Sequence, residues 1–268
     1  MCPRLFTIGS FSLPTYGLLV ALGFLLGITL AGKLARRTKV DPTHVSNLGV
    51  YLALSAIVGA KVFLILANWR YYSGDWSRLF SLSALQAGGV FYGGLLGALL
   101  TAFLYTRKYH LPGLLTADIF APAVAAGHAV GRLGCFAAGC CWGRETDVPW
   151  AVVFSDPFAH QNTGVPLGLH VHPTQLYESF GTALIAFYLY RYFQKSHPPG
   201  AVIGRYLILY SSFRFVVEFF RDNAARPMIF DDGLSATQWT AVFLILGGIA
   251  ILMRNRGQTP GGAARQAG

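Results

Sequence analysis

The stretch LPTYGLLVALGFLLGITLAG, residues 13–32, decides the fold, because twenty residues pass without one charged side chain. A helix of about 20 predominantly apolar residues crosses the roughly 30 Å hydrocarbon core of a bilayer. The rest of the chain has the same character: 54% of its 268 residues are hydrophobic and 12% are charged, with a mean hydropathy of +0.48. A soluble domain carries about twice that share of charged residues. The sequence therefore predicts an integral membrane protein.

Six further apolar blocks follow, and none shows the alternation of about ten residues that marks a membrane β-strand. We expect an all-α membrane protein with seven transmembrane helices in one domain, residues 1–253. A short polar, Gly-rich stretch, 254–268, predicts a disordered cytoplasmic tail. The expected helices are roughly 13–32, 46–67, 88–106, 113–135, 175–193, 202–220 and 236–253.

Basic residues collect in the loops after the first, third, fifth and seventh blocks. Lys and Arg accumulate on the cytoplasmic side of membrane proteins. This pattern places the N-terminus outside and the C-terminus in the cytoplasm. It also accounts for the net charge of +10 without invoking nucleic acid as a partner.

Several ionisable residues fall inside the apolar blocks, where they are costly unless they face a partner or a polar cavity. Arg214 and Glu218 are four residues apart, as are His128 and Arg132, so each pair shares a helix face. The predicted topology places them toward the outer leaflet, where an arginine can grip a lipid phosphate with two hydrogen bonds. Two plainer interpretations stay open: Glu218 forms an internal ion pair with Arg221, and His128 is a buried hydrogen-bonded residue.

Several motifs, in this order, resemble the phosphatidylglycerol–prolipoprotein diacylglyceryl transferases. The resemblance covers nearly the whole chain and is specific as a combination. The motifs are Tyr16–Gly17, Gly59–Lys61, GGxxG in the third block, GRLGxF from Gly131, WGR at 142–144, HPTQLYES at 172–179, RxxxEFxR from Arg214 and LSxxQW from Leu234.

The resemblance implies a multi-pass enzyme of the bacterial inner membrane, with its active site toward the outer leaflet. It would move the diacylglyceryl group of phosphatidylglycerol to the lipobox cysteine of a prolipoprotein signal peptide and release glycerol phosphate. Membrane lipids are its other partners, and no cofactor or metal is implied. The residues so implicated are Tyr16, Arg132, Arg214 and Glu218 in catalysis, and Arg132, Arg214, Gly143, Tyr92, Gly93 and Gly94 in binding phosphatidylglycerol.

The sequence departs from the usual family pattern GRxGNFxNxE, because Cys135, Ala138 and Cys140 replace two asparagines and a glutamate. Tyr92 likewise stands where a histidine is usual. We add His128 to the catalytic candidates as a replacement imidazole. Two alternative functions remain: a relative of the same fold acting on another lipid or thiol, and a transporter of an anionic solute.

The stretch GRLGCFAAGCCWGR, residues 131–144, carries three cysteines on the predicted outer, oxidising side. In that environment we expect a disulfide between Cys135 and either Cys140 or Cys141. A zinc site is not expected, because CxxC spacing is absent and no paired histidines lie nearby.

Overall fold

The computed structural model describes residues 3–8, 11–74, 89–222 and 233–255. All seven predicted segments contain a helix whose ends lie within a few residues of the prediction. These are α1 (Thr15–Ala35), α2 (Pro42–Ala67), α5 (Phe91–Lys108), α6 (Gly113–Ala138), α8 (Thr174–Phe193), α9 (Ala201–Val217) and α10 (Ala236–Asn255).

Smaller elements that the sequence analysis did not predict lie between these helices. They are the hairpin β1 (Arg4–Ile8) and β2 (Phe11–Pro14), the antiparallel pair β3 (Val152–Val153) and β4 (His170–Val171), the short helices α3 (Trp69–Ser73) and α7 (Pro157–Thr163), and the 3₁₀ turn η2 (Glu218–Phe220) that ends α9. The predicted tail falls mainly on residues 256–268, outside the described residues, and α10 continues to Asn255.

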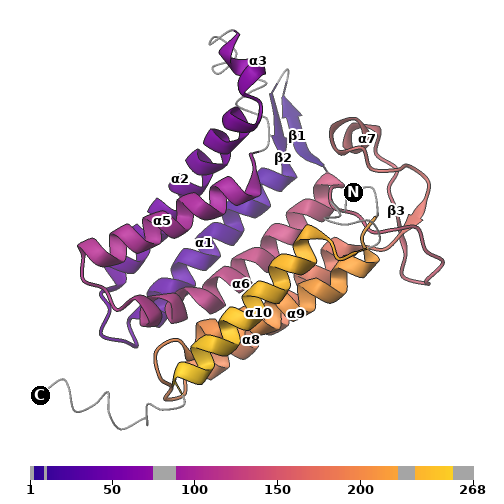
Figure 1. The fold of residues 1–268 in the computed structure, drawn as a ribbon. Helices are drawn as coiled ribbons and strands as arrows, with labels where there is room; N and C mark the ends of the chain where they lie inside the picture. Colours follow the sequence, from indigo (N-terminus) through magenta and orange to yellow (C-terminus); the bar gives the residue numbers. More distant parts are fainter. Residues whose placement is uncertain (1–2, 9–10, 75–88, 223–232, 256–268) are drawn as a thin grey trace, which may run out of the picture. The chain divides into compact units, whose positions relative to one another are not determined.

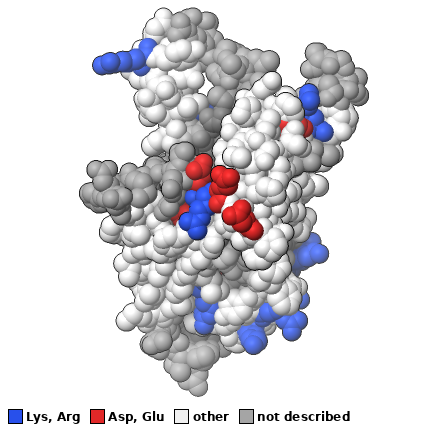
Figure 2. Space-filling view, turned by 90° about the vertical axis from the view of Figure 1, so that its right-hand side faces the viewer, with Lys and Arg blue, Asp and Glu red and all other residues white. Residues whose placement is uncertain are grey.

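Four of the described helices, α1, α2, α6 and α10, are long and apolar enough to cross a membrane. Large apolar side chains also face outward along the helices; Phe187 of α8 and Phe243 of α10, for example, are about two-thirds exposed, at 64% and 66%. Figure 2 shows mostly uncharged side chains on the surface, with basic and acidic ones confined to small groups. The chain is therefore an α-helical membrane protein, while its seven-span topology stays a prediction.

The chain divides into two compact units, one made of residues 1–31 and 117–268 and the other of residues 32–116. In the second unit α2 packs along α5 (Figure 1). Gly59 and Gly93 meet at this contact, where a Cβ on either would collide with the backbone oxygen of the other. Small residues that let two backbones approach are a common way to join helices in lipid. Gly93, Gly94 and Gly97 of the third block therefore lie in a helix–helix contact.

In the first unit α9 packs against both α8 and α10 (Figure 1). The buried Asp118 of α6 fixes the start of α9 by accepting hydrogen bonds from the backbone N–H groups of Gly200 (2.6 Å), Val202 (3.0 Å) and Ile203 (2.7 Å). These N–H groups have no partner within their own helix, so an acidic side chain is well placed there. Asp118 is thus engaged in holding two helices together.

The connection between α6 and α8 has a small hydrophobic core of its own. Phe154, Ala159, Val165 and Val171 are buried in it, and Phe136 of α6 packs against them. Helix α7 is capped at its start by Asp156, whose carboxylate accepts hydrogen bonds from the backbone N–H groups of two following residues. This core gives the segment after α6 a defined path back toward the start of α8.

Candidate active site

Arg132, in the last two turns of α6, contacts side chains of its own helix and of α8. Its Nη2 lies 2.6 Å from Oε2 of Glu178, its Nε donates a 3.1 Å hydrogen bond to Nε2 of His128, and its Nη1 lies 4.0 Å from Sγ of Cys135. His128 and Cys135 are one helical turn before and after Arg132, so all three share a face of α6. The guanidinium is therefore held in one orientation by partners on two helices.

Glu178 connects Arg132 to a second arginine. Its other oxygen, Oε1, lies 3.7 Å from Nε of Arg214 on α9, and Arg214 Nη1 lies 2.7 Å from Oε2 of Glu218. Glu218 also approaches Arg221 at 3.9 Å. These five residues, which we call the ion cluster, contain three arginines and two glutamates. With His128 neutral, the cluster carries one net positive charge.

Glu178 is the residue that the sequence analysis missed. The spacing along the sequence offers Arg214 and Arg221 a single nearby glutamate, Glu218. In the structure Glu178, only 2% exposed, lies between Arg132 and Arg214. The available signal was the motif HPTQLYES. Helix capping alone does not explain why Gln175, Tyr177 and Glu178 occur together in it.

Glu218 is fully engaged. Its Oε2 pairs with Arg214, its Oε1 accepts a 2.9 Å hydrogen bond from Ser235 Oγ, and its side chain is 1% exposed. The predicted pairs of Glu218 with Arg214 and Arg221 are both present. A carboxylate held in this way suits the positioning of Arg214 better than proton transfer.

The end of α6 turns the chain back on itself. The backbone N–H of Gly139 donates to the Phe136 carbonyl (3.2 Å) and that of Cys140 to the Cys135 carbonyl (3.1 Å), which is the hydrogen-bond pattern of a Schellman motif. Gly139 takes the left-handed conformation that this motif requires, with φ 75°. Cys140 and Cys141 consequently lie beside Cys135 rather than a turn further along the helix.

The first turn of α8 fixes this turn in place. Thr174 Oγ1 donates a 2.7 Å hydrogen bond to the Cys141 carbonyl, and Gln175 Nε2 donates one of the same length to the Cys140 carbonyl. Pro173 occupies the capping position of α8, and the threonine hydroxyl is used across the site. Glu178 follows one turn later, so a single helix start holds both the cysteine turn and Arg132.

Gly143 lies where three backbone segments meet. Its N–H donates to the His172 carbonyl (2.9 Å), and the residue forms an isolated bridge with Arg221. A Cβ at this position would collide with His172 and with the Phe220 carbonyl. The geometry favours a packing role for Gly143, and its predicted contact with lipid stays a prediction.

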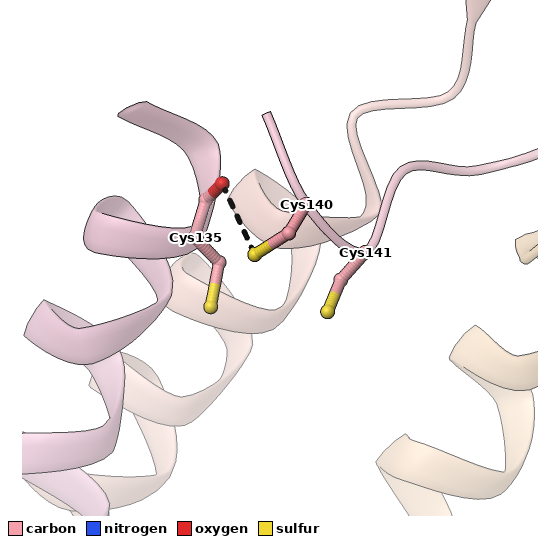
Figure 3. Close-up of side chains that lie close together, drawn as sticks. All are labelled: Cys135, Cys140 and Cys141. Atoms are coloured by element: carbon pink, nitrogen blue, oxygen red, sulfur yellow. Dashed lines mark hydrogen bonds between the residues drawn. The ribbon is translucent and has the colours of Figure 1, made fainter. Parts of the chain in front are cut away.

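The three cysteine thiols of this turn are half-buried and free. Their sulfur atoms all lie within 4.8 Å of one another. Figure 3 shows Cys135 on its helix and the side chains of Cys140 and Cys141 on the segment that follows this helix. The disulfide expected from the sequence is not formed in this structure. Hydrogen bonds with Cys135 and Cys140, aided by the charges of Arg132 and Arg221, lower the pKa of the Cys141 thiol.

The family assignment comes from comparison with known proteins. The family model described as prolipoprotein diacylglyceryl transferase matches residues 3–254. The chain belongs to this family.

Three relatives, each named phosphatidylglycerol–prolipoprotein diacylglyceryl transferase, are similar to this family member over almost their whole length. The protein from Clostridium tetani is 32% identical over 257 residues, covering 96% of this chain and 98% of its own. That from Pseudoalteromonas translucida is 34% identical, covering 94% and 91%. That from Vibrio vulnificus strain CMCP6 is 36% identical, covering 93% and 90%.

The other candidate catalytic and lipid-binding residues of this transferase-family member lie in both units. Tyr16, in the first turn of α1, lies against Gly134 of α6 and is 45% exposed. His128 accepts a hydrogen bond from Arg132 through Nε2, but its side chain is 26% exposed, so it is half-buried. Tyr92, Gly93 and Gly94 belong to the other unit, and their part in binding lipid stays a prediction.

Proposed function

We propose that this protein transfers the diacylglyceryl group of phosphatidylglycerol to the lipobox cysteine thiol of prolipoproteins and releases glycerol phosphate. Membership of the transferase family supports the reaction. The observation that carries it is the ion cluster, in which Glu178 holds Arg132 and Arg214 together with one positive charge in excess. That excess equals the single negative charge of a phosphodiester.

The reaction needs stabilisation of the departing phosphate. The substrate thiol gives its proton to solvent and its sulfur attacks the glyceryl carbon, so that the C–O bond breaks with its electron pair on the phosphate oxygen. The leaving group gains a second negative charge, and fixed guanidinium groups stabilise charge that develops in the transition state. Arg132 and Arg214 are suited to this because their counter-ions hold them in place before the lipid arrives.

We further propose that seven helices span the bacterial inner membrane, with the N-terminus outside and the cluster toward the outer leaflet. The loop charges support this topology. A reporter fused after Gly268 should then score as cytoplasmic, and a periplasmic score would overturn the orientation. A transporter would need polar groups continuing to the cytoplasmic half, and Asp118 is already engaged at the start of α9.

The test is transfer by the purified protein, incubated with phosphatidylglycerol and a lipobox peptide. We expect the peptide to gain the mass of one diacylglyceryl group as glycerol phosphate is released, and a peptide with serine in place of cysteine to gain nothing. Arg214→Ala should abolish transfer, whereas Arg191→Ala, an exposed arginine at the end of α8, should not. No mass gain from wild-type protein that unfolds cooperatively would overturn the proposal.

A further inference from the structure

Three cysteine thiols lie beside the ion cluster, and the reaction as described above does not use them. Their sulfur atoms lie within 4.8 Å of one another, and Cys135 Sγ lies 4.0 Å from Nη1 of Arg132. Cys135 follows Arg132 by three residues on the same helix face. Any ligand shared by the three thiols would therefore lie next to a proposed phosphate-binding arginine.

The backbone holds the thiols in this arrangement at several points. Gly139 and Cys141 both take left-handed conformations, with φ 75° and 61°. Such a conformation is uncommon for a residue other than glycine and persists where the surrounding structure imposes it. Here Thr174 holds the carbonyl of Cys141 by a hydrogen bond, and Gln175 holds the carbonyl of Cys140 in the same way. The convergence of the sulfurs is thus fixed by the backbone and by α8.

We propose that Cys135, Cys140 and Cys141 bind one zinc ion as thiolates, and that the fourth zinc position receives the substrate thiol. The inference rests on the proposed transferase function and deepens it. Zinc sites that act in catalysis have three protein ligands and one open position. With Zn–S distances of about 2.3 Å, tetrahedral ligands lie about 3.8 Å apart, so small side-chain rotations would close the present cluster around the ion.

Zinc would supply the step for which the ion cluster has no free base. A thiol that binds zinc loses its proton, and the thiolate is the competent nucleophile. The proton goes to solvent, the sulfur forms the new S–C bond, and the C–O bond breaks with its electron pair on the phosphate oxygen. No electron is gained or lost by the metal. Glu218 is not required as a base, in agreement with its two hydrogen-bonding and ionic partners.

The local charges suit such a site. Zinc with three thiolates carries one negative charge, which becomes two when the substrate thiolate binds. Arg132, already in contact with Cys135, is placed to offset this charge and to hold the phosphate beside it. The sequence did not predict a metal site, because CxxC spacing is absent. The Schellman turn brings Cys135 and Cys140 together without that spacing.

Metal binding is tested first on the whole purified protein with reduced thiols. Elemental analysis should find one zinc per chain, and Co²⁺ in its place should give the sulfur-to-cobalt absorption of a thiolate site. Cys140→Ser and Cys141→Ser should each lower the bound metal at least tenfold. Cys2→Ser, which changes the remaining cysteine of the chain, should leave it at one. Protein that takes up neither metal would overturn the proposal.

Substrate binding at the metal is tested by adding a lipobox peptide to the cobalt-loaded protein without phosphatidylglycerol. The cobalt absorption should shift with the cysteine peptide and stay unchanged with its serine counterpart. An unchanged spectrum with both peptides would overturn the role of the open position. Full transfer by zinc-free protein would refute the zinc step while leaving the transferase function intact. Zinc-loaded protein that binds the peptide but transfers nothing would refute the transferase function instead.

Discussion

Replacing Glu178 with glutamine should weaken both the fold and the reaction, because this carboxylate is the link between Arg132 and Arg214. The substitution keeps the size and one accepting oxygen of the side chain but removes its charge. Arg132 then loses its 2.6 Å counter-ion, and the ion cluster carries two positive charges in excess instead of one. Like-charged guanidinium groups would move apart.

The size of the effect follows from the burial of the pair. Removing one partner of a buried ion pair costs about 3–5 kcal/mol, and the hydrogen bond that glutamine retains returns about 1 kcal/mol, which leaves about 2–4 kcal/mol. The middle of this range is about 3 kcal/mol. At roughly 2–4 °C per kcal/mol for a chain of this size, it corresponds to a fall in Tm of about 6–12 °C. A guanidinium displaced by about 1 Å would slow transfer on the order of 100-fold.

The assay is thermal unfolding in detergent together with the peptide transfer rate. Glu145→Gln serves as the control, since it makes the same chemical change at an exposed position of the same unit. Its effect should stay within about 0.5 kcal/mol, as for most surface substitutions. If Glu178→Gln matches the control in both Tm and transfer rate, the carboxylate does not position Arg132 and the reasoning about the ion cluster fails.

Three further predictions concern glycines of the first unit. Gly139→Ala and Gly168→Ala both place alanine at a left-handed position, at a cost of about 1–2 kcal/mol each. Only Gly139→Ala also crowds neighbouring side chains, so urea unfolding should show it as the more destabilised; equal losses would mean that the neighbours yield freely. Gly143→Ala should reduce the yield of folded protein in size-exclusion chromatography, because its Cβ meets a facing backbone, and a normal elution profile would contradict the close approach. Gly131→Ala meets open space within α6 and should raise stability by about 0.5–1 kcal/mol; slower transfer by this more stable variant, measured with the lipobox peptide, would show that lipid uses the space.

The sequence predicted the helices well because long apolar blocks leave little choice in a bilayer. It also identified the Arg214–Glu218 pair, whose members lie one helical turn apart. It did not find the Arg132–Glu178 pair, since those residues belong to helices separated by a long connection with its own small core. Local spacing carries no information on such a contact.

The cysteines show the same limit. Their spacing along the chain indicated only that two of them could be joined, and the expected disulfide is replaced by three converging free thiols. The left-handed residue at Gly139 was a readable signal for the end of α6. The left-handed conformation of Cys141 was not, because nothing in its residue type favours it.

The distance along the chain between Arg132 and Glu178 has a consequence for synthesis. Glu178 lies 46 residues after Arg132, which corresponds to roughly 2–9 s at ribosomal rates of about 5–20 residues per second. During that interval the arginine enters the bilayer without its partner, at a cost below the roughly 2.5–3.5 kcal/mol of an arginine at a helix centre, because Arg132 lies near the end of α6. Helix α6 is therefore expected to reach its final depth only after α8 has been inserted, so that the order of translation sets the order in which the site is assembled.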